Sequence, residues 1–190
     1  MKARRLLFLG PPGVGKGTQA QRLVRDLGVP QISTGDMLRT AVAAGTEIGK
    51  KARSYMDRGE LVPDEVVIGV AEARLSDADV AAGFILDGFP RTVAQAEALD
   101  RILAKIGREL ECCVVLEVAE EALVKRLLNR ATLEGRSDDN EETIRNRMRV
   151  YRRQTEPLVA YYRRRGIVRE LDGLGSMDEV AERIRRVLAA

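Results

Sequence analysis

Several residue types that would mark particular chemistries are missing or scarce in this chain. It contains no histidine, which excludes imidazole acid–base catalysis and zinc chemistry. Its only two cysteines, Cys112 and Cys113, are neighbours in an apolar run, so we expect small buried side chains on opposite faces of a strand, with no disulfide and no metal site. No apolar run is long enough to span a bilayer, and the N-terminus lacks the long apolar core of a signal peptide. We therefore expect a protein of the reducing cytoplasm, with no membrane partner.

Charge and length narrow the class further. The chain has 190 residues, of which 45% are hydrophobic, so one compact domain over residues 1–190 is expected. Its 32 basic and 29 acidic residues give a formal net charge of +3. This balance is not that of a polybasic nucleic-acid binder, and we expect no nucleic-acid partner.

The stretch from Leu6 to Thr18 carries the strongest functional signal. Leu6 to Leu9 is an unbroken apolar run, which predicts a strand buried on both faces, and a glycine-rich turn follows it. Glycines without a Cβ let successive backbone N–H groups converge on an anion. Lys16 adds a mobile positive charge, and the next helix directs its positive dipole end to the same place. This is the Walker A form, with one glycine inserted before Thr18, and it predicts binding of a nucleoside triphosphate.

Strands and helices alternate along the rest of the chain. Apolar runs around residues 29–32, 83–87, 111–118 and 167–171 predict four more strands. We therefore expect a three-layer α/β fold with a central five-stranded parallel sheet flanked by helices, and ligands at the carboxyl ends of its strands. Asp87 ends one strand, where a carboxylate would organise the water around Mg²⁺, and Arg91 follows closely.

Charged and weakly anchored segments flank this predicted site. The segment from Asp36 to Arg58 predicts two helices broken at Gly45 with few apolar residues, which is typical of a flap that moves. A helix over 120–134 places Arg126 and Arg130 on one face, and a long helix over 141–165 presents Arg147. Other arginines of that long helix are expected to be solvated surface charges, namely Arg149, Arg152, Arg153, Arg163, Arg164 and Arg165.

Four motifs together resemble the adenylate kinase family from end to end. They are residues 10–20, which contain the phosphate loop, Ser33 to Arg39, Asp87 to Thr92, and Gly135 to Asp139, in the family's order. The resemblance implies a P-loop nucleotide kinase fold and reversible phosphoryl transfer from MgATP to AMP, giving two ADP, for adenine nucleotide homeostasis. Catalysis would then depend on positioning and charge neutralisation, because three equatorial oxygens share the charge of the transferred group.

The resemblance also implies roles for individual residues. The ATP phosphates would be held by Gly13, Val14, Gly15, Lys16, Gly17 and Thr18, with Arg130 above them and Gly175 at the adenine. AMP would be held by Thr34, Arg39, Glu60, Leu61, Val62, Gly88, Phe89, Pro90, Arg91, Gln95, Arg136 and Arg147. Among these, Arg39 and Arg91 would bind the AMP phosphate, and Thr34 and Gln95 would read the base. The catalytic set would be Lys16, Asp87, Arg91, Arg126, Arg130, Arg136 and Arg147, with Mg²⁺ held through phosphates and water near Thr18 and Asp87.

The chain differs from the long members of this family between its arginine pairs. Those members carry an inserted lid, sometimes with a four-ligand zinc site, whereas only residues 131–135 separate Arg130 from Arg136 here. We therefore expect the short-lid form without zinc. In it, residues 33–62 would form a mobile monophosphate-binding subdomain and residues 130–136 a short lid loop. A monomer is expected, since no repeated apolar surface pattern demands a partner.

Two other functions are compatible with part of this pattern. A UMP/CMP kinase of the same short-lid kind shares most motifs, but such enzymes usually carry a small apolar residue where Thr34 stands, so Thr34 favours AMP. A nucleotide-dependent switch protein would turn over ATP slowly without any monophosphate. The arginines clustered for a second phosphate disfavour that alternative.

Overall fold

The computed structural model describes residues 3–134 and 140–189 of the chain. In this part, five strands form one parallel sheet in the order β2-β3-β1-β4-β5. The strands are β1 (Arg5–Leu9), β2 (Gln31–Ser33), β3 (Phe84–Asp87), β4 (Cys112–Glu117) and β5 (Val168–Asp172). The predicted α/β class with five parallel strands is confirmed, and the largest boundary difference is at β2, which begins two residues later than its apolar run suggested.

The helices follow the predicted alternation. They are α1 (Lys16–Leu27), α2 (Thr34–Ala43), α3 (Glu47–Asp57), α4 (Asp64–Leu75), α5 (Val93–Lys105), α6 (Glu120–Glu134), α7 (Glu141–Val150), α8 (Pro157–Arg163) and α9 (Met177–Ala189). A short 3₁₀ helix, η1 (Ala78–Ala82), precedes β3 and was not predicted. Helix α6 ends at Glu134, so the described part of the expected lid segment 130–136 is helical.

The long helix predicted over 141–165 is interrupted. A π-helical turn, η3 (Tyr151–Thr155), separates α7 from α8, and the N–H of Glu156 bonds to the Tyr151 carbonyl at 2.9 Å. Pro157 begins α8 and has no N–H to give to the preceding turn, so a regular helical ladder cannot continue through it. The interruption places Thr155 against the loop that follows β3, which bears on the site below.

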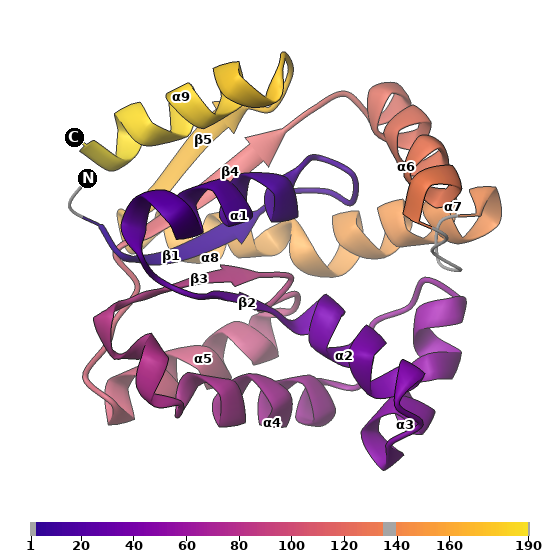
Figure 1. Cartoon of the computed structure of the whole chain (residues 1–190), viewed down its shortest axis with the longest axis horizontal. Helices are drawn as coiled ribbons and strands as arrows, with labels where there is room; N and C mark the ends of the chain where they lie inside the picture. Colours follow the sequence, from indigo (N-terminus) through magenta and orange to yellow (C-terminus); the bar gives the residue numbers. More distant parts are fainter. Residues whose placement is uncertain (1–2, 135–139, 190) are drawn as a thin grey trace.

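Each face of the sheet has its own hydrophobic core. Along β1, Leu6 and Phe8 pack among α1, α6, α7 and α9, whereas Leu7 and Leu9 pack among α4, α5 and α8 (Figure 1). The alternation follows from the pleat of the strand, and covering both faces with helices explains the unbroken apolar run. Cys112 and Cys113 divide between the two cores as expected, and both are free thiols whose pKa is raised by burial.

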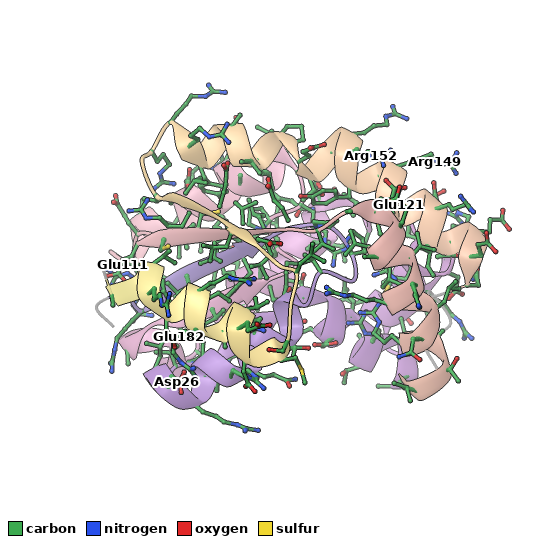
Figure 2. All side chains as sticks on the ribbon, turned by 90° about the horizontal axis from the view of Figure 1, so that it is seen from above. Asp26, Glu111, Glu121, Arg149, Arg152 and Glu182 are labelled. Carbon is green, nitrogen blue, oxygen red and sulfur yellow. The ribbon has the colours of Figure 1, made fainter. Side chains whose placement is uncertain are left out.

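Some arginines expected to be solvated form surface ion pairs instead. Arg152 pairs with Glu120 of α6, while Arg163 and Arg165 pair with acidic residues of β5 and α5. Figure 2 shows Arg149 and Arg152 at the outer side of the molecule near Glu121, which lies in the first turn of α6. Exposed ion pairs of this kind contribute little to the free energy of unfolding. The sequence interpretation therefore missed the partners of these arginines but no large contribution to stability.

Helices α2 and α3 form a hairpin that packs through a glycine. A Cβ at Gly49 would lie 2.0 Å from the carbonyl oxygen of Ala41, so only glycine permits this approach. Ser33 caps α2 by accepting a hydrogen bond from the Asp36 N–H at 3.3 Å, and Thr46 caps α3 in the same way. The hairpin therefore depends on a backbone contact more than on apolar side chains.

The end of this hairpin is attached to α7. The Thr143 hydroxyl donates to the carbonyl of Asp57 at 3.2 Å, and the Asn146 amide donates to that of Arg58 at 2.6 Å. At Gly59, with φ of 68°, a Cβ would lie 2.8 Å from the Thr143 carbonyl oxygen. Together these contacts join the segment after α3 to the helix that carries Arg147.

Candidate functional site

A cleft lies at the carboxyl ends of β1 and β3, between the phosphate loop and the α2–α3 hairpin. It is lined by most of the residues predicted for AMP, together with the phosphate-loop lysine: Lys16, Thr34, Arg39, Glu60, Leu61, Val62, Gly88, Pro90, Arg91, Gln95 and Arg147. Phe89 does not line the cleft, because its side chain is fully buried in the core beside α5. Arg136 lies outside the described residues.

The phosphate loop takes backbone conformations that glycine provides. Gly15 is the N-cap of α1 with φ of 103°, and Gly13 has φ of 82°. A Cβ at Gly13 would also lie 2.8 Å from the Leu127 side chain, so α6 packs directly on the loop. Because α1 begins at Lys16, its first N–H groups and its positive dipole end face the loop. This is the geometry of an anion-binding helix N-terminus.

Lys16 points back over the loop. Its ammonium group donates to the carbonyls of Gly10 at 2.8 Å and Pro11 at 3.1 Å. The pKa of Lys16 is lowered to about 8, chiefly by burial and also by Arg91, Arg147 and Arg130, against an opposing effect of Asp87. The carbonyl partners of Lys16 are neutral, and Asp87 only partly compensates its charge. A bound phosphate would supply the missing negative charge.

Asp87 stands at the end of β3, as predicted. Its Oδ2 accepts a hydrogen bond from Gln31 at 3.1 Å and lies 3.3 Å from the position of a Cβ at Gly17. The extra glycine in the loop therefore leaves room for this carboxylate beside the start of α1. Thr18 is exposed one residue further along the helix. A hydroxyl and a carboxylate are hard oxygen groups, which suit the water shell of Mg²⁺.

Two guanidinium groups converge at the start of α2. A Cβ at Gly35 would lie 3.2 Å from Arg39 Nη2 and 3.5 Å from Arg91 Nη2. Arg91 Nε donates to the Gly88 carbonyl at 2.8 Å, and Arg39 pairs with Asp36 at 2.5 Å. Two guanidinium groups beside a helix N-terminus form an environment suited to a phosphate.

The two predicted base readers are held by other parts of the protein. Thr34 is 1% exposed, and its hydroxyl donates to the Gly88 carbonyl at 2.9 Å. Gln95 is also 1% exposed; its Oε1 accepts from the Arg91 N–H at 2.7 Å, and its Nε2 donates to Asp64 at 2.8 Å. Both side chains are therefore fixed before any ligand arrives.

Sequence reasoning missed two polar residues that hold this region in place. Thr155 of η3 donates its hydroxyl to the Arg91 carbonyl at 2.8 Å, and Asp64 of α4 bonds to Gln95. An acid in the first turn of α4 already has a local explanation, because it complements the helix dipole. A local pattern could not reveal either contact, because the partners stand 64 and 31 residues away in the chain.

The residues predicted for the ATP side are less enclosed. Arg126 and Arg130 are partly exposed on α6, outside the set that lines the cleft, although Arg130 lies close enough to lower the pKa of Lys16. Gly175 is exposed in the loop between β5 and α9. The structure does not bring these three residues into the cleft with the AMP-side set.

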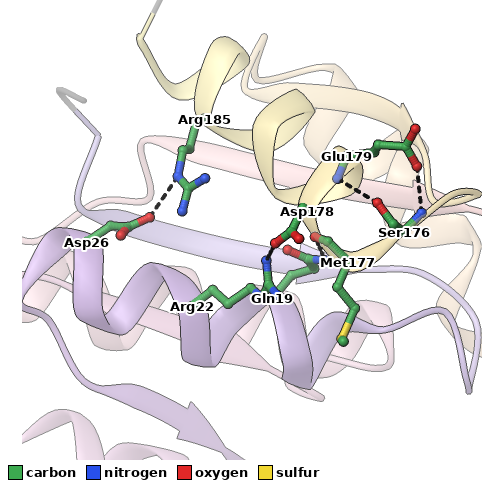
Figure 3. Close-up of polar contacts among 8 residues, drawn as sticks. All are labelled: Gln19, Arg22, Asp26, Ser176, Met177, Asp178, Glu179 and Arg185. Carbon is green, nitrogen blue, oxygen red and sulfur yellow. Dashed lines mark hydrogen bonds and ion pairs between the residues drawn. The ribbon is translucent and has the colours of Figure 1, made fainter.

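The loop that contains Gly175 lies beside the phosphate loop. Gln19 of α1 donates its amide to the Met177 carbonyl at 3.0 Å, and Arg22 pairs with Asp178 (Figure 3). Ser176 and Glu179 hydrogen-bond each other's backbone N–H groups at the start of α9. These contacts place the start of α9 beside the N-terminal half of α1, and the contact of Gly175 with the adenine stays a prediction.

The described residues contain neither a metal-binding cluster nor a helix that could span a membrane. Among residues 3–134 and 140–189, no group of three or more Cys, Asp or Glu side chains is placed to hold a metal ion. No helix in that part of the chain is long and apolar enough to cross a membrane.

Comparison with known proteins gives a consistent result. A family model described as adenylate kinase matches residues 8–167. An adenylate kinase of Leptospira biflexa is 58% identical over 181 residues, which is 95% of this chain and 97% of that protein. Adenylate kinases of Xanthomonas euvesicatoria and Xanthomonas campestris are 55% and 56% identical over 184 residues, 97% of this chain and 98% of each relative.

Proposed function

The chain belongs to the adenylate kinase family and transfers the terminal phosphoryl group of ATP reversibly to AMP, giving two ADP; we propose that the cleft described above holds AMP beside an ATP-bound phosphate loop. The observation that carries this assignment is the convergence of cations between the loop and the α2–α3 hairpin. Lys16 comes from the loop, Arg39 from the hairpin, and Arg91 and Arg147 from two further elements. One phosphate group does not need that many cations, whereas two facing phosphates do.

The chemistry proposed for these cations is positioning and charge neutralisation. Arg39 and Arg91 hold the AMP phosphate at the start of α2, with its oxygens directed toward the phosphate loop. Lys16 exchanges its two carbonyl partners for the ATP phosphates. Arg147, together with Arg136, compensates the charge spread over the transferring group, so no general base is required.

Base recognition is proposed to rest on Thr34 and Gln95. The Thr34 hydroxyl gives its proton to Gly88, so its remaining lone pairs can only accept from a ligand. An acceptor at that position complements the exocyclic amino group of adenine. Gln95 offers one further donor and one further acceptor. Glu60, Leu61, Val62 and Pro90 shape the walls around these groups, and Phe89 supports them from the core.

Mg²⁺ is proposed to enter with ATP rather than bind to a protein cage. Thr18 at the start of α1 and Asp87 at the end of β3 are the oxygen groups placed to hold its water shell and the phosphates. When bound, the ion neutralises charge on the phosphates. Oδ2 of Asp87 accepts a hydrogen bond from Gln31 and lies next to Gly17 at the start of α1.

Closure over ATP is proposed to involve the two arginines on α6. Arg126 and Arg130 share a face of that helix and lie outside the cleft in this conformation. Movement of α6 together with the short lid segment, residues 130–136, would bring them over the phosphates, while residues 33–62 close over AMP. Gly175 would meet the adenine of ATP through its backbone. The absence of zinc from this lid stays a prediction.

The active unit is proposed to be a monomer in the cytoplasm. The sequence shows no repeated apolar surface pattern that demands a partner. The two free thiols suit a reducing compartment. Light scattering after size-exclusion chromatography tests the monomer, with an unchanged mass at saturating ATP and AMP as the expected result.

ADP formation from MgATP, offered AMP, UMP, CMP or GMP separately, tests the substrate assignment. Strong turnover with AMP alone supports the proposal, and a reaction without any acceptor is the control. Turnover that prefers UMP or CMP would keep the reaction and change the substrate. Turnover indifferent to the acceptor would assign the chain to the class of nucleotide-dependent switch proteins.

A further inference from the structure

We propose that Asp64 determines the choice between adenine and guanine in the acceptor site by fixing the orientation of the Gln95 side-chain amide. This inference rests on the proposed binding of AMP in the cleft. Asp64 is not among the residues that line the cleft, whereas Gln95 is. Asp64 would therefore act as a positioning residue, through Gln95 and without touching the substrate.

The chemistry of its two partners allows only one orientation of the Gln95 amide. Oε1 faces the backbone N–H of Arg91 at 2.7 Å, and Nε2 faces Oδ1 of Asp64 at 2.8 Å. A backbone N–H only donates, and an ionised carboxylate only accepts. Reversing the amide would place two donors together and two acceptors together. Because Gln95 is 1% exposed, water could not compensate for those lost bonds.

The fixed amide offers a ligand one defined pair of groups. A glutamine amide has two N–H donors and two acceptor lone pairs, and each of its ends has already used one. One lone pair on Oε1 and one N–H on Nε2 therefore remain for a ligand, and the two groups cannot exchange places. The amide end that faces position 6 of a purine decides which purine fits.

Adenine and guanine differ in the polarity of that position. Adenine carries an amino donor at position 6 beside an acceptor at N1, whereas guanine carries a carbonyl acceptor at position 6 beside a donor at N1. On that edge a glutamine pairs with adenine by accepting from the amino group at position 6 through its oxygen and donating its N–H to N1. The reversed amide would pair with guanine equally well. A glutamine that could rotate would accept both bases, and Asp64 acts together with the Arg91 N–H to prevent that rotation.

Asp64 is itself held in place by a second contact. The Thr92 hydroxyl lies 3.1 and 3.2 Å from the two carboxylate oxygens of Asp64. The same hydroxyl accepts a hydrogen bond from the backbone N–H of Gln95 at 3.2 Å. Thr92 is the N-cap of α5, and Asp64 is in the first turn of α4, where a negative charge is favourable. The starts of two helices thus fix one carboxylate, which in turn fixes the amide.

The test substitutes Asp64→Asn, which keeps the size of the side chain. The new amide can present either its oxygen or its NH₂ group to Gln95, so reversing the Gln95 amide then costs only the bond from the Arg91 N–H and no longer both bonds. We expect the ratio of kcat/KM for AMP to that for GMP to fall about tenfold or more. The KM for AMP should rise and measurable turnover with GMP should appear, while the KM for ATP stays within twofold.

Glu65→Gln is the matched control. It removes the same charge from the same turn of α4, and Glu65 is exposed and does not line the cleft. Its AMP-to-GMP ratio should stay within twofold of the wild-type value. Both substrates are measured on one preparation, so a loss of folded protein cancels from the ratio and a purely structural role of Asp64 would not change it.

The possible results separate this inference from the function it rests on. A wild-type protein that does not form ADP with AMP would overturn the proposed function and, with it, the role of Asp64. A wild-type protein selective for AMP, with an Asp64→Asn variant whose ratio is unchanged, would overturn the role of Asp64 alone. An equal fall in Glu65→Gln would also overturn it, since the cause would then be charge at the helix start.

Discussion

The sides of this enzyme proposed to bind AMP and ATP are prepared for their ligands to different degrees. On the AMP side, Thr34, Arg91 and Gln95 already hydrogen-bond to backbone or buried side chains and line one cleft. On the ATP side, Arg126 and Arg130 stand partly exposed on α6, and Gly175 lies in an exposed loop. The difference follows from what each side has to recognise.

A base is recognised by the order of donors and acceptors, and a triphosphate by charge. An order of donors and acceptors is lost if a side chain rotates, so buried partners must fix it beforehand. Electrostatic attraction acts over a longer distance, so the side chains that bind a triphosphate can move into place after the ligand has bound. We infer that this enzyme fixes its selectivity at the acceptor site and completes its donor site by movement. Four changes to the protein test this comparison.

Replacing an arginine on each side should give the largest contrast. Arg91→Ala removes a guanidinium that is held in the cleft through Gly88, and we expect kcat to fall about 100-fold, which corresponds to roughly 3 kcal/mol of transition-state stabilisation. Arg126→Ala should mainly raise the KM for ATP, by about tenfold, because Arg126 reaches the site only on closure. Steady-state kinetics with each substrate varied separately distinguishes the two patterns. Equal losses of kcat would show that both sides are equally prepared.

A single methyl group in the α2–α3 hairpin should weaken the AMP side selectively. In Gly49→Ala the new Cβ would meet the Ala41 carbonyl oxygen, so the two helices must separate. We expect the free energy of unfolding to fall by about 1–3 kcal/mol and the KM for AMP to rise several-fold, with the KM for ATP unchanged. Chemical denaturation and steady-state kinetics measure these effects.

Gly69→Ala is the control for that substitution. Gly69 lies within α4 with no atom within 4 Å of its Cβ position, so alanine should stabilise the helix by about 1 kcal/mol. If both alanine variants behave alike, the close contact at Gly49 is not what holds the hairpin.

Removing the hydroxyl of Thr34 should relax base choice with little effect on the reaction itself. In Thr34→Ala the acceptor proposed for the adenine amino group disappears, and Gly88 loses one donor. We expect the preference for AMP over UMP and CMP to fall by about tenfold. Thr40→Ala, at an exposed position of the same helix, should leave that preference unchanged. An unaltered preference in Thr34→Ala would count against the role of Thr34.

The sequence predicted those parts of the molecule whose causes are local. The glycine-rich turn after β1, the strand ending at Asp87 and the helix over 120–134 were all placed correctly, because spacing and apolar runs determine them. The functions of Arg39, Arg91 and Arg147 came through resemblance. The structure adds that all three line one cleft.

The contacts that hold the base readers could not be predicted. Asp64 had a sufficient local explanation as a helix-start acid, and its contact with Gln95 exists only because α4 and α5 begin side by side. The Thr155 hydroxyl reaches the Arg91 carbonyl because Thr155 lies in the π-helical turn before Pro157. A periodic pattern predicts a helix over 141–165, but it does not show where one extra residue enters a turn. Packing between distant segments decides both features.

The smallest expected effect is a proton taken up at the phosphate loop. The free protein holds the pKa of Lys16 at about 8, chiefly through burial, whereas a bound triphosphate favours the charged form. At pH 8 about half of the free protein would carry a neutral Lys16, so ATP binding should take up as much as half a proton; at pH 6.5 uptake by Lys16 should be close to zero. The terminal phosphate is itself ionised at pH 8, because the pKa of a phosphate monoester is about 6.

Titration calorimetry in two buffers of different ionisation heat measures this uptake. AMP binding serves as one control, since Lys16 is assigned to ATP. Lys16→Arg is the other, because a guanidinium stays charged throughout this range and should abolish the uptake at pH 8. Uptake that persists in Lys16→Arg would assign the proton to another group. Uptake seen only with the wild-type protein and only with ATP would show that Lys16 becomes fully protonated when ATP binds. The Gln95 amide, by contrast, already has its orientation in the free protein.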